Sequence, residues 1–400
     1  FSTSSSATFS TISYNIRAIE TPPRDRIVNS ANTIYVIAGN SGVTIGYSGN
    51  TASGRYSTAE GDNTEASDDA CHAEGYQTKA IGMYSHSEGY QSKAIGNYSH
   101  AEGGYQTIAS GMCSHVEGYG TEANGEASHA EGYLTKATGD YSHSEGQSTV
   151  ASDVCAHAEG YSTEASGENS HAEGSQTKAL GWQSHAEGFM TEAYGEASHA
   201  EGQYTYANGD MSHATGTHTQ AVGSFSYAGG DGSVASGTTS FTHGIGTKSY
   251  NDCEFSCGRY NASHVGTTGS TTASLFTIGY GSKDTDQKNA IEITQTGVLK
   301  ANQAWTTGSD RKLKENITPL ENDTLDKVLQ LNPVKFTLKD DIDKKERIGF
   351  IAQEVEELFP QYVTVSIGDD NEETRYLDYS QMVSISVSYT HLTLPTICSV

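Results

Sequence analysis

The chain has 400 residues, a formal net charge of −26, 44 glycines and only 34% apolar residues. This acidity argues against a nucleic-acid partner, which would need a basic stripe to bind phosphates. No run of about 18 apolar residues occurs, so the sequence predicts no membrane insertion. Composition alone is typical of a disordered chain, but repeats at a fixed period indicate a solenoid instead.

The main repeat is a tetrad, His-x-Glu-Gly, that occurs ten times between His72 and Gly202. The interval is 14 residues, with one step of 15 where Gly103-Gly104 adds a residue. Numbered from the residue before the histidine, small residues fill positions 1, 3, 5, 8, 10 and 12 of each repeat. This alternation predicts two short strands of five residues per coil, each followed by a turn. Glycine at position 5 or 12 is expected to supply the corners.

The predicted interior is unusually thin, because only Ala, Ser, Thr and Gly line it. Such a roll buries too little apolar surface to be stable alone, so partner chains are expected. Positions 2 and 4 are His and Glu in ten coils, whereas positions 9 and 11 vary. We therefore expect three identical chains to turn their His/Glu faces toward a shared axis. The expected trimer-interface ladder consists of His72, Glu74, His86, Glu88, His100, Glu102, His115, Glu117, His129, Glu131, His143, Glu145, His157, Glu159, His171, Glu173, His185, Glu187, His199 and Glu201.

The ladder has two chemical interpretations. The favoured one is a lattice of hydrogen bonds between chains, in which each carboxylate accepts from an imidazole N–H. Metal chelation by imidazoles and carboxylates at each level is the alternative, but metal sites seldom recur at every rung and need outer-shell support. No metal and no cofactor are therefore predicted. Acid–base catalysis is not expected, because a ladder offers no cleft.

The variable face is expected to meet solvent. There, Glu122 beside Lys136 and Glu164 beside Lys178 predict ion pairs between neighbouring rungs.

The repeat "SHAEG…A.G" resembles the head repeat of trimeric autotransporter adhesins of the YadA type, over about residues 40–250. The resemblance implies a left-handed parallel β-roll that assembles as a homotrimer. Those repeats typically read S-V-A-I-G, so His and Glu here stand in place of apolar Val and Ile. This difference implies a hydrogen-bonded interface rather than an apolar one.

The six cysteines predict neither disulfides nor a metal site. Cys71, Cys113 and Cys155 stand at or beside the first position of three different repeats, too far apart for bonding. Cys253 and Cys257 lack the second pair that a zinc site needs. We therefore expect small, reduced side chains.

Beyond the repeats, the segment "ASLFTIGYGSKDTDQKNAIEITQTGVLKAN" predicts three strands separated by turns. It resembles the connector that precedes the C-terminal domain of phage tail proteins, and a generic β-hairpin is an equal interpretation. The following composition, rich in Lys, Leu, Val and Glu, predicts a small α+β domain. "TLDKVLQL" has helical spacing, "PVKFTL" has strand spacing, and "RIGFIAQEVEELFPQYV" predicts a strand followed by a helix closed by Pro360.

The opening of this domain holds Ser309 and Lys314, a nucleophile and, if desolvated, a base. Their spacing alone favours an ordinary surface lysine. The set "SDRKLKENI", "LNPVKF", "IGFIAQEVEELFP" and "LDYSQ" resembles the self-cleaving intramolecular chaperone domain of phage endosialidases and tail fibres. The resemblance implies that Ser309 is the nucleophile and Lys314 the general base, with Asp310 and Asn316 in supporting roles. It places cleavage at Ser309, either at the Gly308–Ser309 bond or at the bond that follows.

The predicted fold is mostly β: a trimeric left-handed parallel β-roll of 14-residue coils, a β connector and a small α+β domain. Because the chain begins at Phe1 and not at Met, a longer parent chain is expected. The expected segments are an N-terminal β-rich fragment (1–45), the β-roll (46–223), a looser β shaft (224–308), a truncated chaperone domain (309–387) and a tail resembling translated sequencing-adapter read-through (388–400).

Three functions are compatible with these features. The favoured hypothesis is a trimeric phage tail fibre or tailspike segment, carried on the virion, that attaches to a host glycan or outer surface protein. Its only enzymatic activity would be single-turnover self-cleavage. The alternative is a trimeric adhesin on a bacterial surface. A polysaccharide-degrading tailspike ranks third, because no paired acids stand out from the ladder.

Overall fold

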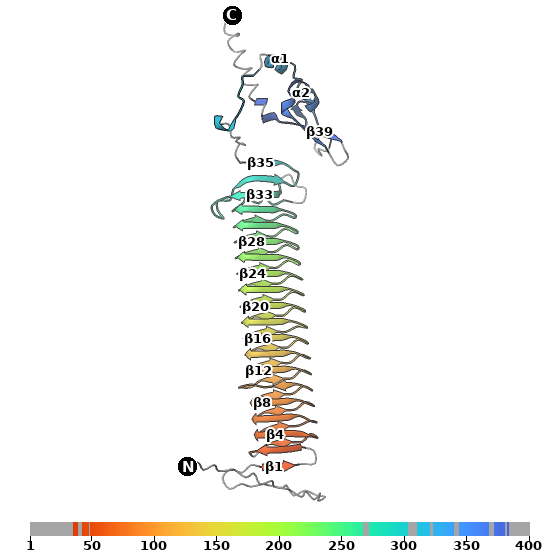
Figure 1. The fold of residues 1–400 in the computed structure, drawn as a ribbon, viewed down its shortest axis with the longest axis vertical. Coiled ribbons are helices and arrows are strands. Elements are labelled where there is room, and N and C mark those ends of the chain that lie inside the picture. Colours follow the sequence, from red (N-terminus) through yellow and green to blue (C-terminus); the bar gives the residue numbers. More distant parts are fainter. Residues whose placement is uncertain are drawn as a thin grey trace, which may run out of the picture. The chain divides into compact units, whose positions relative to one another are not determined.

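The computed structural model describes the chain in two units, Phe1–Ala304 and Trp305–Val400 (Figure 1). No helix among the described residues is long and apolar enough to cross a membrane. The described residues are 35–38, 42–47, 49–266, 272–302, 310–320, 323–339, 344–367, 372–380 and 382–383.

The first unit is a parallel β-solenoid, which confirms the predicted fold class (Figure 1). A coil consists of a longer strand such as β6 (His72–Tyr76) and a two-residue strand such as β7 (Lys79–Ala80). The second strand of each coil is therefore shorter than the five residues predicted. Before the first coil, β1 (Tyr35–Ala38) pairs antiparallel with β2 (Gly42–Gly46).

The longer strands stack into one sheet and the two-residue strands into a second sheet of 15 strands. In the first sheet, β2 is followed by β4 (Ser57–Asp62), β6, β8 (His86–Tyr90), β10 (His100–Ala101), β12 (His115–Tyr119), β14 (His129–Tyr133), β16 (His143–Gln147), β18 (His157–Tyr161), β20 (His171–Ser175), β22 (His185–Phe189), β24 (His199–Gln203), β26 (His213–Thr217), β28 (Tyr227–Asp231), β30 (Phe241–Ile245) and β32 (Phe255–Arg259). The second sheet contains β3 (Thr51–Ala52), β5 (Glu65–Ala66), β7, β9 (Lys93–Ala94), β11 (Ile108–Ala109), β13 (Glu122–Ala123), β15 (Lys136–Ala137), β17 (Val150–Ala151), β19 (Glu164–Ala165), β21 (Lys178–Ala179), β23 (Glu192–Ala193), β25 (Tyr206–Ala207), β27 (Gln220–Ala221), β29 (Val234–Ala235) and β31 (Lys248–Ser249).

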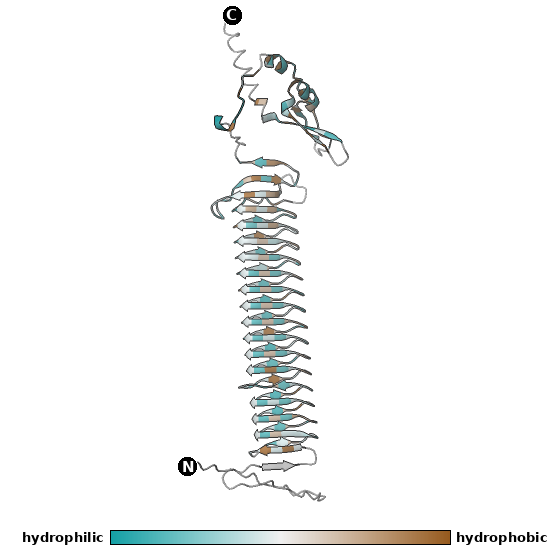
Figure 2. Ribbon diagram, viewed as in Figure 1, coloured by the Kyte–Doolittle hydropathy of each residue, from teal (hydrophilic) through white to brown (hydrophobic). Residues whose placement is uncertain are grey.

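The interior of each coil is lined almost entirely by small side chains from both strands, as predicted. Ala73, Thr78 and Ala80 have no exposed surface, and Ser85 is 2% exposed. Figure 2 accordingly colours most coil strands from teal to pale, with few strongly hydrophobic residues. Stability must therefore come mainly from the backbone hydrogen bonds between coils and from whatever covers the outer faces.

The corners of the coil contain other residues in the left-handed conformation besides the predicted glycines. A Cβ atom on Gly75 would lie 2.2 Å from the carbonyl oxygen of Gly89, so this position requires glycine. The residues at positions 7 and 14 also have left-handed backbone conformations, although most of them are not glycines. Gln77 has φ of 54° and Tyr84 has φ of 58°. The corners therefore store backbone strain that the stacked coils must hold in place.

The pairing register between neighbouring coils is maintained at two irregularities in the sequence. At the 15-residue step, β10 shortens to two residues, and His100 still pairs with His115. The coils also continue through residues 224–259, where the sequence repeat weakens. Phe241 lies opposite both Tyr227 and Phe255 in the parallel sheet.

The three predicted strands after the coils are confirmed. The first, β33 (Ser274–Tyr280), adds to the solenoid sheet in parallel with β32. The other two, β34 (Asn289–Thr294) and β35 (Leu299–Ala301), continue it antiparallel.

A buried polar cluster closes this end of the solenoid. Glu254 is fully buried at the position that holds serine in most coils. Its Oε2 accepts hydrogen bonds from the backbone N–H of Asn251 at 3.1 Å and from Ser263 Oγ at 2.8 Å. Asn261 donates to the backbone oxygen of Lys248 at 2.8 Å. These groups satisfy polar atoms that a further coil would otherwise cover.

The second unit is a small α+β domain, as predicted. Its elements are η1 (Arg311–Leu313), α1 (Thr324–Leu329), β36 (Val334–Phe336), β37 (Arg347–Gly349), α2 (Ala352–Leu358), η2 (Pro360–Tyr362), β38 (Val363–Ile367) and β39 (Glu373–Leu377). Its core is built around Val355, Phe359, Tyr362 and Met382. The helix α2 ends just before Pro360, as its sequence predicts.

We predict that Gly160→Ala destabilises the solenoid by about 2 kcal/mol or more. Gly160 has φ of 107°, and a Cβ there would lie 2.1 Å from the carbonyl oxygen of Gly174. Gly104→Ala is the matched control, because a Cβ at Gly104 meets nothing within 4 Å. Thermal unfolding followed by circular dichroism measures both. Equal melting temperatures for the two variants would contradict the close packing of the coils.

We also predict a pH dependence that arises at Glu254. Burial raises the pKa of this carboxyl above its ordinary value, so its contribution to stability is full at low pH. That contribution is lost as pH rises through the raised pKa. Glu254→Gln, which keeps the shape but carries no charge, should therefore gain stability relative to the wild type as pH rises from about 4, the ordinary pKa of a glutamate, through the raised pKa of Glu254. Parallel melting curves for the two proteins across this range would show that Glu254 does not titrate as described.

Candidate functional site

The predicted ladder is one continuous pair of columns on the sheet of longer strands. Each tetrad histidine begins a strand, and its glutamate lies two residues later on the same face. From His72 to His199, successive imidazole rings are stacked 4.7–5.0 Å apart. His213 extends the column by one ring, 4.7 Å from His199. The structure therefore brings all the predicted ladder residues together.

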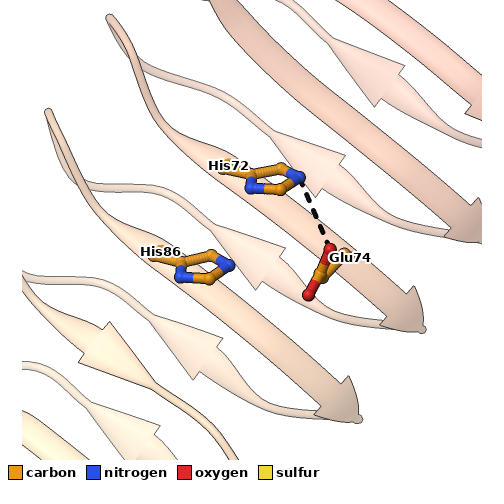
Figure 3. A group of neighbouring side chains, drawn as sticks. All are labelled: His72, Glu74 and His86. Atoms are coloured by element: carbon orange, nitrogen blue, oxygen red, sulfur yellow. Dashed lines mark ion pairs between the residues drawn. The ribbon is translucent and has the colours of Figure 1, made fainter.

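Apart from His115, each imidazole of the column has its Nε2 atom within 4.0 Å of a carboxylate oxygen of the same chain, as Figure 3 shows for His72. His72 Nε2 lies 3.8 Å from Glu74 Oε2, and His100 Nε2 lies 3.6 Å from Glu102 Oε2. Farther along, the nearest carboxylate belongs to the preceding coil, as in the 3.4 Å approach of His199 to Glu187. Most of these separations exceed the normal range of a hydrogen bond.

The Nε2 atoms are enclosed although the rings are about one-third exposed. Within the described part of the chain, these atoms have almost no solvent contact and no hydrogen-bond partner. They belong to His72, His86, His100, His115, His129, His143, His157, His171, His185, His199 and His213.

The carboxylate column is strained electrostatically, because like charges lie one coil apart. A hydrogen bond with Glu88, together with burial, raises the pKa of Glu74 to about 7. Glu159 has the same effect on Glu145, whose pKa is also raised to about 7. Burial lowers the pKa of His143, which favours the neutral imidazole. The imidazoles therefore do little to neutralise the carboxylates beside them.

Apolar side chains occupy both ladder positions at the start of the solenoid and position 2 near its other end. At the start, Val43 and Ile45 are in register with positions 2 and 4 of the next coil. Near the other end, the imidazole column gives way to Tyr227, Phe241 and Phe255, whose rings stack 4.7 and 4.8 Å apart. The place of these apolar residues in the ladder columns was not predicted, although counting positions 2 and 4 beyond the tetrads would have found it.

The opposite face carries one of the two predicted ion pairs. Lys136 Nζ lies 3.2 Å from Glu122 Oε1 in the neighbouring coil. Glu164 and Lys178 are partners in the sheet register, but Glu164 Oε1 instead accepts a hydrogen bond from Ser166 Oγ at 2.9 Å. The five described cysteines are free thiols.

The predicted Ser–Lys site is only partly described. Ser309 and Gly308 lie outside the described residues, so the approach of the serine to Lys314 is untested. Asp310 caps the N-terminus of the short helix η1, where its carboxylate accepts a hydrogen bond from the backbone N–H of Lys312 at 3.0 Å. Lys314 and Asn316 are exposed, and Asn316 has φ of 52°.

Two known families match parts of the chain. Residues 309–364 match the chaperone of endosialidase, and residues 200–226 and 214–240 match two copies of the YadA head domain repeat. The chain carries YadA-type head repeats and an endosialidase-type chaperone domain. A comparison with curated protein sequences found no match. The chaperone match begins at Ser309 and includes α1, β36, β37 and α2. The two matches confirm the resemblances to YadA-type head repeats and to the endosialidase-type chaperone domain.

Proposed function

We propose that three copies of this chain assemble into a surface-exposed attachment fibre through their ladder faces. The observation that carries the proposal is the ladder face itself, which is uniform in its middle and apolar at both ends. YadA-type head repeats support trimeric association, and adhesins and tail fibres are extracellular or surface-exposed proteins.

The interior of the coil explains why partners are needed. Its buried side chains are mostly Ala, Ser and Thr, so folding one chain removes little apolar surface from water. Packing three chains together would bury the aromatic rings at one end of the ladder face and Val43 at the other. Phe255 is 38% exposed and Val43 is 36% exposed in the single chain. The apolar ends would then shield the polar ladder between them from water.

The variable face is the surface left for a receptor. Its outward side chains differ from coil to coil, from Glu122 and Lys136 to Val150 and Tyr206. Variation of this kind suits recognition, because a shared structural role would hold the residues constant. The receptor proposed is a host glycan or an outer surface protein.

The C-terminal domain would serve as the intramolecular chaperone of the fibre. Parallel packing of three solenoids requires contacts distant in sequence, so finding the correct register is slow. Association of three compact C-terminal domains would raise the local concentration of the shafts. Cleavage after assembly would leave the shaft kinetically trapped.

The proposed cleavage uses Ser309 and Lys314. The Ser309 hydroxyl attacks the carbonyl carbon of Gly308, and the Lys314 amine takes its proton and passes it to the departing amide nitrogen. Water then hydrolyses the resulting ester, which restores the hydroxyl. Because Lys314 is exposed in the single chain, its amine would need to be desolvated by assembly before it can act as a base.

The fibre could belong to a phage virion or to a bacterial surface. We propose that it is a phage tail fibre or tailspike segment on the virion. The endosialidase-type chaperone domain supports this choice. A trimeric adhesin on a bacterial surface is the second candidate, and the YadA-type head repeats favour it.

We predict that Phe241→Asp prevents trimer formation, because it places three charges at the apolar end of the shared axis. Val234→Asp is the matched control, since Val234 lies in the neighbouring two-residue strand β29 on the opposite face. Native mass spectrometry should find trimers of the control and monomers or aggregates of Phe241→Asp. Trimers of both variants would place the interface elsewhere, and circular dichroism verifies that each variant contains β-structure.

We predict that the wild-type chain separates into two fragments at Ser309 and that Ser309→Ala and Lys314→Ala remain whole. Lys312→Ala is the control for loss of a nearby positive charge and should cleave normally. A denaturing gel with mass determination of the fragments measures all four proteins. A wild-type chain that runs at full length, like the Ser309→Ala variant, would contradict self-cleavage.

A further inference from the structure

The enclosed edge of the imidazole column is not explained by contacts between chains. The Nε2 atoms, from His72 to His213, have almost no solvent contact within the chain itself. An atom that a water molecule cannot touch is also out of reach of a carboxylate from another chain. The hydrogen bonds expected between chains must therefore use other atoms of the ladder, and Nε2 faces only its own chain.

The spacing around Nε2 suits two ligands of one metal ion. The Nε2–carboxylate oxygen separations are 3.8 Å for His72 and Glu74, 3.6 Å for His100 and Glu102, and 3.4 Å for His199 and Glu187. Two ligands of a tetrahedral ion, each about 2.0–2.2 Å from the metal, lie about 3.3–3.6 Å apart. Small side-chain movements would bring the wider pairs into this range.

A third ligand comes from the neighbouring coil. The ligand atoms of His72, Glu74 and His86 all lie within 4.8 Å of one another (Figure 3). The same holds for the cluster of Glu145, His157 and Glu159. Imidazole nitrogen with carboxylate oxygen is the ligand set of zinc and related transition metals, whereas calcium and magnesium prefer oxygen ligands alone.

We propose that the ladder binds divalent transition-metal ions of the zinc class between neighbouring coils, through imidazole Nε2 and carboxylate oxygen atoms. Each ion replaces the missing partner of an enclosed nitrogen and neutralises carboxylates that lie one coil apart. All the ligands of a cluster come from one chain, so binding does not depend on the number of chains that assemble.

Neighbouring clusters share ligands, which limits the number of ions. Glu159 belongs both to the cluster with Glu145 and His157 and to the cluster with His171 and Glu173. An ion in one cluster therefore withdraws a ligand from the next. We expect binding at about every second coil, or roughly five ions per chain, with three protein ligands each.

The test is equilibrium dialysis of the full chain, stripped with a chelator, against Zn²⁺ in the presence of excess Mg²⁺, followed by metal analysis. The wild type should retain several zinc ions per chain. Glu159→Gln should retain one or two fewer, and so should His157→Gln, which leaves the number of carboxylates unchanged. Glu164→Gln, on the opposite face, is the control and should match the wild type.

Three results would overturn the proposal: no zinc retained by the wild type, displacement of zinc by Mg²⁺, or equal retention by all the variants. The last two would indicate ions held only by general surface acidity. Replacing Zn²⁺ by Co²⁺ gives a second readout, because coordinated imidazole and carboxylate change the visible spectrum of the ion. That spectrum should weaken in His157→Gln and not in Glu164→Gln, and circular dichroism verifies that the variants are folded.

Discussion

The close approach of successive coils is the constraint on which the rest of the first unit depends. Gly75 and Gly89 are so near that no side chain fits between their backbones, and Ala73 and Ala80 fill the interior. A coil this narrow satisfies its backbone hydrogen bonds along the stack but buries little apolar surface. Its outer faces must therefore bury the additional surface that the interior is too narrow to provide.

Stacking in strict register converts each outward position into a column of side chains. The chemistry of those side chains determines what each face of the solenoid can contact. The middle of the ladder face holds imidazoles and carboxylates, and its ends hold rings such as Phe241 and aliphatic groups such as Val43. Apolar ends around a polar centre suit a shared axis from which water is excluded. The opposite face keeps no constant residue, which leaves it free for recognition.

Much of this organisation was predictable from the sequence. The 14-residue period and the small residues at alternate positions were sufficient to predict the coils, their interior and the ladder. In the second unit, the spacing of apolar residues and Pro360 predicted the helix α2 and its end.

Other features depend on the three-dimensional structure. Gln77 and Tyr84 have no strong preference for the left-handed conformation, so the corners follow from stacking and not from local propensity. Residues 224–259 keep the coil because backbone register persists after the side-chain pattern weakens. The enclosed Nε2 atoms depend on side-chain rotamers, which the order of residues does not reveal. The arrangement of Ser309 with Lys314 remains a prediction from the family resemblance.

The most direct test of the central claim, that the ladder faces pack together because one coil is too thin to be stable alone, is the mass of the folded protein at high dilution. Sedimentation equilibrium of the Ser309→Ala variant, which should remain whole so that each chain keeps its mass of about 42.5 kDa, measures it. The account predicts a single species of three times the chain mass that loses its β-structure when it dissociates. A folded species with the mass of one chain would contradict it.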